Sequence, residues 1–148
     1  MGSRCSDVLV AERTNDILHG KDGVDRLIGK RGDDLIRGGN GSDTLLGGHG
    51  RDRLRGGNHK DRLHGGKGDD TLIGGSGADR FRLSKDNDTI KDFSIKAGDQ
   101  LLISNAIELT IEQIGKHLLL TDADKGISTT LKGVSLDDLL AHQPELLG

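Results

Sequence analysis

Apolar residues recur at every ninth position along the first half of the chain. Each of them follows an aspartate by two positions, and the interval holds from one end of the series to the other. The series is Leu18, Leu27, Ile36, Leu45, Leu54, Leu63, Leu72 and Phe81. So strict a period indicates a structural repeat and not a disordered linker.

Four nine-residue units are complete copies of the pattern G-G-x-G-x-D-x-U-x, in which U is apolar. They begin at Gly38, Gly47, Gly65 and Gly74. Glycine at the first, second and fourth positions permits positive φ, and the x-U-x tail carries one inward apolar side chain. We therefore predict a six-residue turn and a three-residue strand in each unit, with two units forming one flattened coil of eighteen residues.

Stacked coils would place each aspartate over the one eighteen residues away, at a strand spacing of about 4.8 Å. Two carboxylate rows result: Asp7, Asp25, Asp43, Asp61 and Asp79 form one, and Asp16, Asp34, Asp52, Asp70 and Asp88 form the other. Like charges at roughly 5 Å repel by about 1 kcal/mol even in water, so we expect cations between them. Calcium fits best because it takes oxygen ligands, whereas the repeating positions lack the nitrogen and sulfur ligands that transition metals prefer.

The nonapeptide is identified as the calcium-binding repeat of RTX proteins. The segment after it resembles the one that closes RTX β-rolls; the matching residues are Asp92, Phe93, Gly98, Asp99, Leu101, Ile103 and Ser104. This resemblance, to the C-terminal parts of type I-secreted proteases, lipases and alginate epimerases, implies an all-β fold. We expect a right-handed parallel β-roll over residues 1–91, with clean repeats over 20–82, and a C-terminal cap with a secretion-signal region over 92–148.

The cap region has its own patterning. Phe93 can plug the open end of the apolar ladder. Alternation over 107–112, an apolar run from Leu118 and the segment from Ile127 predict a small antiparallel meander. Ser135 and Asp138 form a candidate capping box for a short terminal helix, which Pro144 would perturb.

The resemblance also implies that carbonyls at the second and fourth turn positions complete each calcium shell. Six ions would lie between successive row members from Asp25 to Asp79 and from Asp34 to Asp88, and two more at Asp7/Asp25 and Asp16/Asp34, giving six to eight ions. The expected metal-binding residues are Asp16, Asp25, Asp34, Gly39, Gly41, Asp43, Gly48, Gly50, Asp52, Gly57, His59, Asp61, Gly66, Gly68, Asp70, Gly75, Gly77, Asp79 and Asp88. His59 replaces a glycine, so we expect a weakened turn there.

The composition and the missing motifs argue against several classes of function. The 148 residues contain 24 Gly, one Pro and two Phe as the only aromatic residues, so no conventional aromatic core can form. No G-x-S-x-G, H-E-x-x-H or P-loop motif occurs, and we predict that the chain is not an enzyme. Nucleic acid is disfavoured without stacking aromatics. Neither an 18-residue apolar run nor an N-terminal signal-peptide core occurs, so we expect no membrane span. The resemblance to RTX proteins implies secretion from a bacterium, or display at its surface, through a type I exporter.

Two functions remain. The first is a module that folds on extracellular calcium and supports secretion and stability, because sites with dissociation constants of about 10⁻⁴–10⁻³ M stay empty in the cytosol. The second is calcium-dependent binding of an acidic polysaccharide such as alginate through outward arginines: Arg26, Arg53, Arg55, Arg62, Arg80 and Arg82. The alternative for these arginines is a solvated surface that offsets the acidity and deters lateral association of strands.

Overall fold

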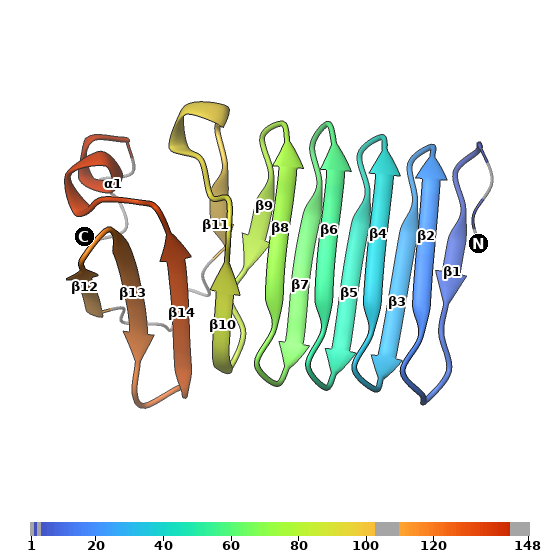
Figure 1. The fold of residues 1–148 in the computed structure, drawn as a ribbon, viewed down its shortest axis with the longest axis horizontal. Coiled ribbons are helices and arrows are strands. Elements are labelled where there is room, and N and C mark those ends of the chain that lie inside the picture. Colours follow the sequence, from blue (N-terminus) through green and yellow to red (C-terminus); the bar gives the residue numbers. More distant parts are fainter. Residues whose placement is uncertain (1, 3, 103–109, 143–148) are drawn as a thin grey trace.

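The computed structural model describes residues 2, 4–102 and 110–142, and shows flattened coils stacked side by side (Figure 1). Successive nine-residue units supply strands to two sheets in turn. The strands of the roll are β1 (Val8–Val10), β2 (Ile17–Asp22), β3 (Arg26–Arg31), β4 (Leu35–Asn40), β5 (Thr44–His49), β6 (Arg53–Asn58), β7 (Arg62–Lys67), β8 (Thr71–Ser76), β9 (Arg80–Arg82), β10 (Asp86–Ile90) and β11 (Gln100–Leu102).

One sheet has the order β1-β3-β5-β7-β9-β11, and the other continues β2-β4-β6-β8-β10 into the cap. Neighbouring strands from β1 to β10 are parallel and in an eighteen-residue register; for example, Leu27 lies opposite Leu45, and Ile36 opposite Leu54. This register confirms the predicted parallel roll of eighteen-residue coils.

The strands are longer than the sequence analysis predicted. Most have six residues instead of three, because pairing continues through the first three positions of the following unit, as at Gly39 opposite Gly57. Without a β-carbon, glycine lets adjacent coils approach closely enough to pair there. Each true turn is therefore confined to the fourth, fifth and sixth positions of its unit.

A ladder of apolar side chains fills the roll. Its fully buried members are Leu27, Ile36, Leu45, Leu54, Leu63, Leu72 and Phe81. Leu9 and Leu18 are only partly buried at the N-terminal end of the ladder. At the other end Phe93 packs against Phe81, with ring centroids 5.9 Å apart, as the plug role predicts.

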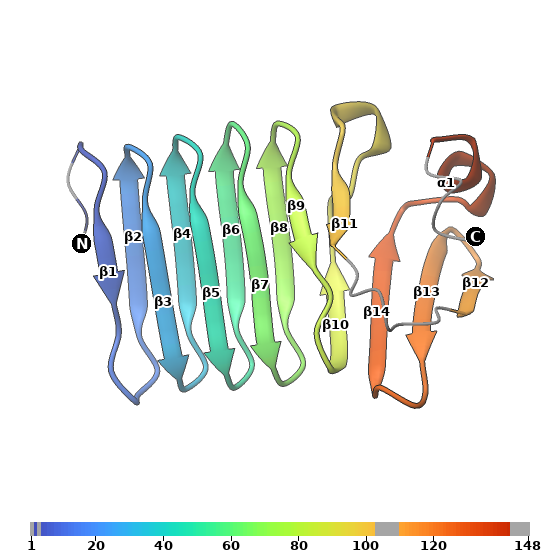
Figure 2. The ribbon, with the colours of Figure 1, turned by 180° about the vertical axis from the view of Figure 1, so that it is seen from behind.

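The C-terminal cap is a small antiparallel sheet followed by one helix. It contains β12 (Thr110–Ile114), β13 (His117–Asp122) and β14 (Ile127–Lys132), and β14 joins the roll by pairing in parallel with β10. Figure 2 shows the cap from behind, at the end opposite the N-terminus. The meander is confirmed over 110–132, whereas its expected start at 107–109 lies outside the described residues, as do Ile103, Ser104 and Pro144.

The terminal helix α1 (Leu136–His142) begins at the predicted capping box. The Ser135 hydroxyl donates to the Asp138 carboxylate at 2.6 Å and accepts from the Asp138 N–H at 3.1 Å. No helix in the described part of the chain is long and apolar enough to span a membrane.

Candidate metal centre

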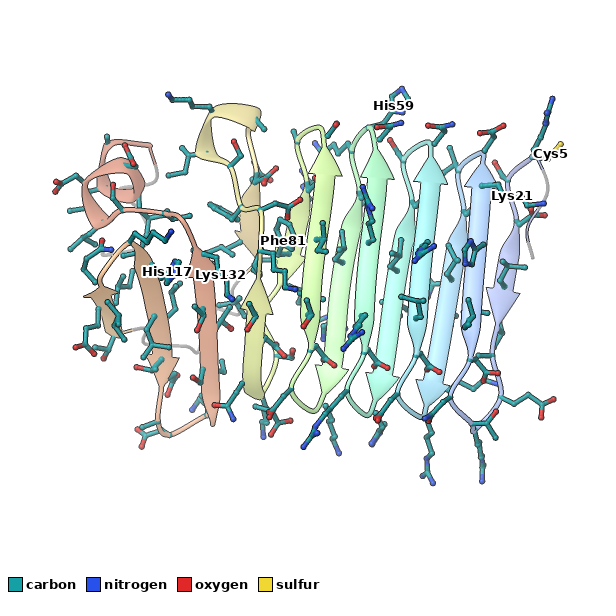
Figure 3. All side chains as sticks on the ribbon, in the orientation of Figure 1. Cys5, Lys21, His59, Phe81, His117 and Lys132 are labelled. Carbon is teal, nitrogen blue, oxygen red and sulfur yellow. The ribbon has the colours of Figure 1, made fainter. Side chains whose placement is uncertain are left out.

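The turns hold backbone conformations that favour glycine. Gly39 and Gly41 have φ values of 125° and 124°. The φ of His59 is 78°, so this residue adopts a positive-φ turn conformation although it is not glycine. Figure 3 shows His59 at the same edge of the roll as Lys21. Lys21 and Lys30 also have positive φ, 87° and 76°, at second positions where later units carry glycine. These non-glycine residues each cost the fold roughly 1–2 kcal/mol.

Aspartates eighteen residues apart are joined directly along both edges of the roll. Each donates its backbone N–H to Oδ1 of the next member of its row, at 2.8–3.1 Å. The joined pairs are Asp7–Asp25, Asp25–Asp43, Asp43–Asp61 and Asp61–Asp79 on one edge, and Asp16–Asp34, Asp34–Asp52, Asp52–Asp70 and Asp70–Asp88 on the other. The structure therefore brings the predicted carboxylates together in two rows, including the irregular N-terminal members.

The second carboxylate oxygen of most row members is buried without a hydrogen-bond partner. This Oδ2 atom is unpaired in Asp25, Asp34, Asp43, Asp52, Asp61, Asp70 and Asp79. A buried polar group without a partner is costly, and a buried charge is far more so. Seven regularly spaced carboxylate oxygens in the roll therefore lack a hydrogen-bond donor, and a cation could take its place.

Burial perturbs the ionisation of these carboxyls. It raises the pKa of Asp43 and Asp52 to about 6, and that of Asp61 and Asp70 to about 7. The hydrogen bond from the preceding row member opposes the rise in pKa, and the charge of that member adds to it. A bound cation would reverse the effect, because an opposite charge favours the ionised form.

The unpaired oxygen borders a space that a β-carbon would fill. In one turn, Oδ2 of Asp43 lies beside the α-carbon of Gly38, and the carbonyl oxygen of Gly56 borders the same space. Both oxygens are acceptors, so they cannot bond to each other. Gly20, Gly29, Gly47 and Gly56 have the same surroundings. The first position of each unit, which lies in a strand, thus supplies both the cradle and a nearby carbonyl. Side-chain periodicity does not reveal where carbonyls point, so the sequence did not predict this arrangement.

Several carbonyls at the second and fourth positions of the unit face the next coil. The oxygens of Gly39, Gly48 and Gly57 point at the glycine eighteen residues later, and so do those of Gly50 and His59. Among the described residues, no three His, Cys, Asp or Glu side chains converge on one point. An ion here would therefore take two carboxylates and complete its shell with carbonyls. This donor set of oxygens suits calcium.

The C-terminal end of each row departs from the repeat. Oδ2 of Asp88 accepts from the Ser84 hydroxyl at 2.6 Å. Asp79 donates its N–H to Asp99, twenty residues on, at 2.9 Å, so Asp99 extends the first row. Asp99 matches the closing segment of RTX β-rolls, but its spacing breaks the period, so the nine-residue pattern does not place it among the metal-binding residues.

The outward arginines form pairs rather than long rows. Arg62 lies opposite Arg80, whereas Thr44 separates Arg26 from Arg62. Arg82 lies opposite His64, whose pKa is lowered by burial and by the Arg82 charge.

On the other sheet, Arg55 lies opposite Arg37, and Arg53 lies between Leu35 and Thr71. A shallow groove of about 510 Å³ runs beside Arg37 and Arg55, and Asn40 and Asn58 also line it.

The chain resembles known calcium-binding repeats. The family model described as RTX calcium-binding nonapeptide repeat (4 copies) matches residues 6–36, 19–54 and 55–90, more than half of the chain. No curated protein matches at a significant level.

Among solved structures, the extracellular lipase LipA from Serratia marcescens is 19% identical, with a TM-score of 0.42; the match covers 93% of this chain and 38% of the lipase chain. The AlgE6R3 subunit of the Azotobacter vinelandii mannuronan C5-epimerase is 24% identical, with a TM-score of 0.37, over 93% of this chain and 79% of that one. The chain thus spans well under half the length of the lipase.

Proposed function

The chain belongs to the family of RTX calcium-binding nonapeptide repeats, and we propose that it is a module whose folding is driven by extracellular calcium. The observation that carries this proposal is the pair of buried aspartate rows with unpaired Oδ2 atoms. Seven buried carboxylates, each with one oxygen that has no partner, oppose the folded state unless cations neutralise them. Calcium supplies the missing charge and accepts both carboxylate and carbonyl oxygens.

Each ion would lie between row members eighteen residues apart. Six sites follow from the regular part of the rows, and the pairs Asp7/Asp25 and Asp16/Asp34 add two at the irregular start. The protein itself holds the carboxylates in successive coils. Glycine at the first position of each unit leaves room for the ion, and the apolar ladder excludes water.

Binding and folding are then one process. The unfolded chain cannot present paired carboxylates, so the free energy of calcium binding becomes free energy of folding. Sites with dissociation constants of about 10⁻⁴–10⁻³ M remain empty inside a cell and fill outside it. This supports a role in secretion by a type I exporter, with an unfolded chain during export and a folded roll afterwards.

A calcium titration followed by far-UV circular dichroism tests the proposal. We expect little β structure in chelator and a cooperative gain in millimolar calcium. Magnesium at equal concentration is the matched control, and it should not substitute, because it keeps its waters and demands a small octahedral shell. Equal ordering by magnesium, or a spectrum that calcium leaves unchanged, would refute the proposal.

A second candidate function is binding of an acidic polysaccharide. The opposed pairs Arg62/Arg80 and Arg37/Arg55 favour it, because guanidinium groups on neighbouring strands, about 4.8 Å apart, can each take a carboxylate bidentately. Calcium binding would also neutralise the acidic edges that repel such a ligand.

Arginine-to-glutamine variants separate specific contact from general charge. The variant R62Q/R80Q/R82Q should lose retention on immobilised alginate in millimolar calcium and low salt. The variant R13Q/R31Q/R51Q removes the same charge from exposed positions outside these pairs and should retain it. If the wild type is not retained by acidic polysaccharides, this function is wrong and the folding module remains.

A further inference from the structure

The turn after β4 contains the one Asn-Gly pair of the sequence, Asn40–Gly41. Asn40 is the last residue of β4, at the edge of the roll where the β4 arrow ends in Figure 1, and it is exposed. Because glycine has no β-carbon, its backbone nitrogen can approach the side chain of the preceding asparagine without hindrance. This pair is therefore the place in the chain where a cyclic imide between an asparagine and the next residue forms most readily.

The reaction takes place within the chain and needs only water as a co-reactant. The backbone nitrogen of Gly41 attacks Cγ of Asn40 and loses its proton, and the side-chain amide leaves as ammonia, which closes a five-membered imide ring. Water then opens the ring. Opening at the former side-chain carbonyl gives aspartate, and opening at the backbone carbonyl gives isoaspartate, in which the chain continues through the side-chain carbonyl. The net change replaces an amide by a carboxylate, with no oxidation or reduction.

The fold itself requires the glycine of this pair. Gly41 has a φ of 124°, and a β-carbon on it would collide with the carbonyl oxygen of Gly23 in the preceding coil. One coil further on, Asn58 lies opposite Asn40 but is followed by His59. The side chain of His59 crowds its own backbone nitrogen, as glycine does not. Asn58 is thus the same residue type at the equivalent position, with a hindered neighbour.

In the folded roll, hydrogen bonds to the neighbouring coils hold both reacting groups. The Gly41 N–H donates to the carbonyl oxygen of Asn58 at 3.2 Å. Nδ2 of Asn40 donates to Oδ1 of Asp22 at 2.7 Å, and Oδ1 of Asn40 accepts from Nδ2 of Asn58 at 2.6 Å. Ring closure would break these bonds, because Cγ of Asn40 must turn onto the Gly41 nitrogen. The reaction therefore requires the coil to open first.

We propose that Asn40 is a deamidation site that is open in the calcium-free chain and closed in the calcium-loaded roll. The inference rests on the calcium-driven folding proposed above. Without ions the neighbouring coils are not stacked, so neither Asp22 nor Asn58 holds the Asn40 side chain, and the Gly41 nitrogen is free to attack. The extent of deamidation at Asn40 then records how long a chain has remained unfolded.

Both products of the reaction disturb the coil. Aspartate at position 40 would place a carboxylate against Oδ1 of Asp22, where the amide now donates, and like charges directly opposite each other on neighbouring strands are destabilising. Isoaspartate lengthens the backbone in the turn that leads to Asp43. This change would shift Asp43 relative to its row neighbours Asp25 and Asp61. A deamidated chain should therefore need more calcium to fold.

Peptide mapping of the whole chain by mass spectrometry measures the reaction at each asparagine. In chelator Asn40 should deamidate while Asn58 stays intact. In millimolar calcium the rate at Asn40 should fall by a factor of about 10² or more, because a stable fold leaves few chains open. Adding urea to the calcium sample should restore the reaction, since the protection comes from folding and not from the ion. Equal rates at Asn40 in chelator and in calcium, or Asn58 reacting as fast as Asn40, would overturn the inference.

Ageing the chain in chelator before a calcium titration tests the consequence. The aged wild type should fold with a calcium midpoint shifted to higher concentration. Asn40→Ser, which introduces the residue type that Ser76 supplies in the same row, cannot form the imide at this position and should have the same midpoint fresh or aged. An aged wild type that is deamidated at Asn40 but keeps its midpoint would overturn the inference. Circular dichroism on the same samples separates the failures: a chain that calcium does not fold refutes the proposed function, whereas one that folds without protecting Asn40 overturns this inference alone.

Discussion

The calcium-free chain should keep more β structure at about pH 5 than at about pH 8. Burial raises the pKa of Asp61 and Asp70 from 3.8 to about 7, and that of Asp43 and Asp52 to about 6. One pKa unit corresponds to about 1.4 kcal/mol, so ionisation in the metal-free roll costs on the order of 4 kcal/mol at Asp61 or Asp70 and on the order of 3 kcal/mol at Asp43 or Asp52. Together these costs are comparable with the whole free energy of unfolding of a typical domain, about 5–15 kcal/mol.

The direction of the pH effect follows from where the protons bind. The folded-state pKa values lie above the unfolded value, so the folded roll binds more protons than the unfolded chain between the two. The stabilisation is complete below about pH 3.8 and is lost as the pH rises through about 6 to 7. Because neighbouring row members titrate together, the loss is spread over this window.

Circular dichroism in chelator across this pH range measures the effect. The variant D61N/D70N, which cannot ionise at two of the four positions, should shift the loss of structure to higher pH. In saturating calcium the wild type should show the opposite trend, since protons compete with the ion for the same oxygens. Metal-free protein that is as ordered at about pH 8 as at about pH 5 would show that ionised carboxylates are not the obstacle to folding.

Three further changes probe separate parts of the roll. Asp61→Ala should remove two ions, because Asp61 bonds to Asp43 on one side and Asp79 on the other, and a calorimetric loss below one ion would contradict shared ligation. Gly56→Ala should remove calcium, because a β-carbon there would collide with Oδ2 of Asp61 and with the backbone carbonyl of Gly74, although the φ of Gly56 itself is not positive, and an unchanged ion count would contradict this. Phe93→Ala should lower the free energy of unfolding in calcium by about 3–5 kcal/mol in denaturant titrations, and a change below about 1 kcal/mol would contradict its role as plug.

The nine-residue period was enough to predict the roll, its register and the two carboxylate rows. The reason is that each unit has the same residue types at equivalent positions: glycine where the chain turns, aspartate at the edge of the roll and one apolar residue pointing inward. Asp25 and Leu27, for example, are placed by the same rule as Asp61 and Leu63. Such agreement between local and global preferences makes a sequence easy to interpret.

The features that the sequence analysis missed depend on backbone orientation or on a break in the period. Strand length was wrong because pairing through Gly39 and its equivalents involves no side chain. The carbonyl of Gly56 beside Asp43 is invisible to residue patterns for the same reason. The nine-residue period does not reach Asp99, because a two-residue insertion shifts it from the expected position, although the nearby buried Leu101 continues the apolar ladder.

The eighteen-residue register also bears on how long such a roll can be. Within the regular coils, every described strand pairing joins residues one coil apart, so none of these pairings determines how many coils the roll contains. A duplication or loss of eighteen residues would leave each remaining strand with an equivalent neighbour. A change of nine would turn the cap to the opposite side of the roll relative to the N-terminus, but β9 would still pair with β11 and β10 with β14, because all four strands lie C-terminal to the change. The number of nine-residue units is therefore free to vary.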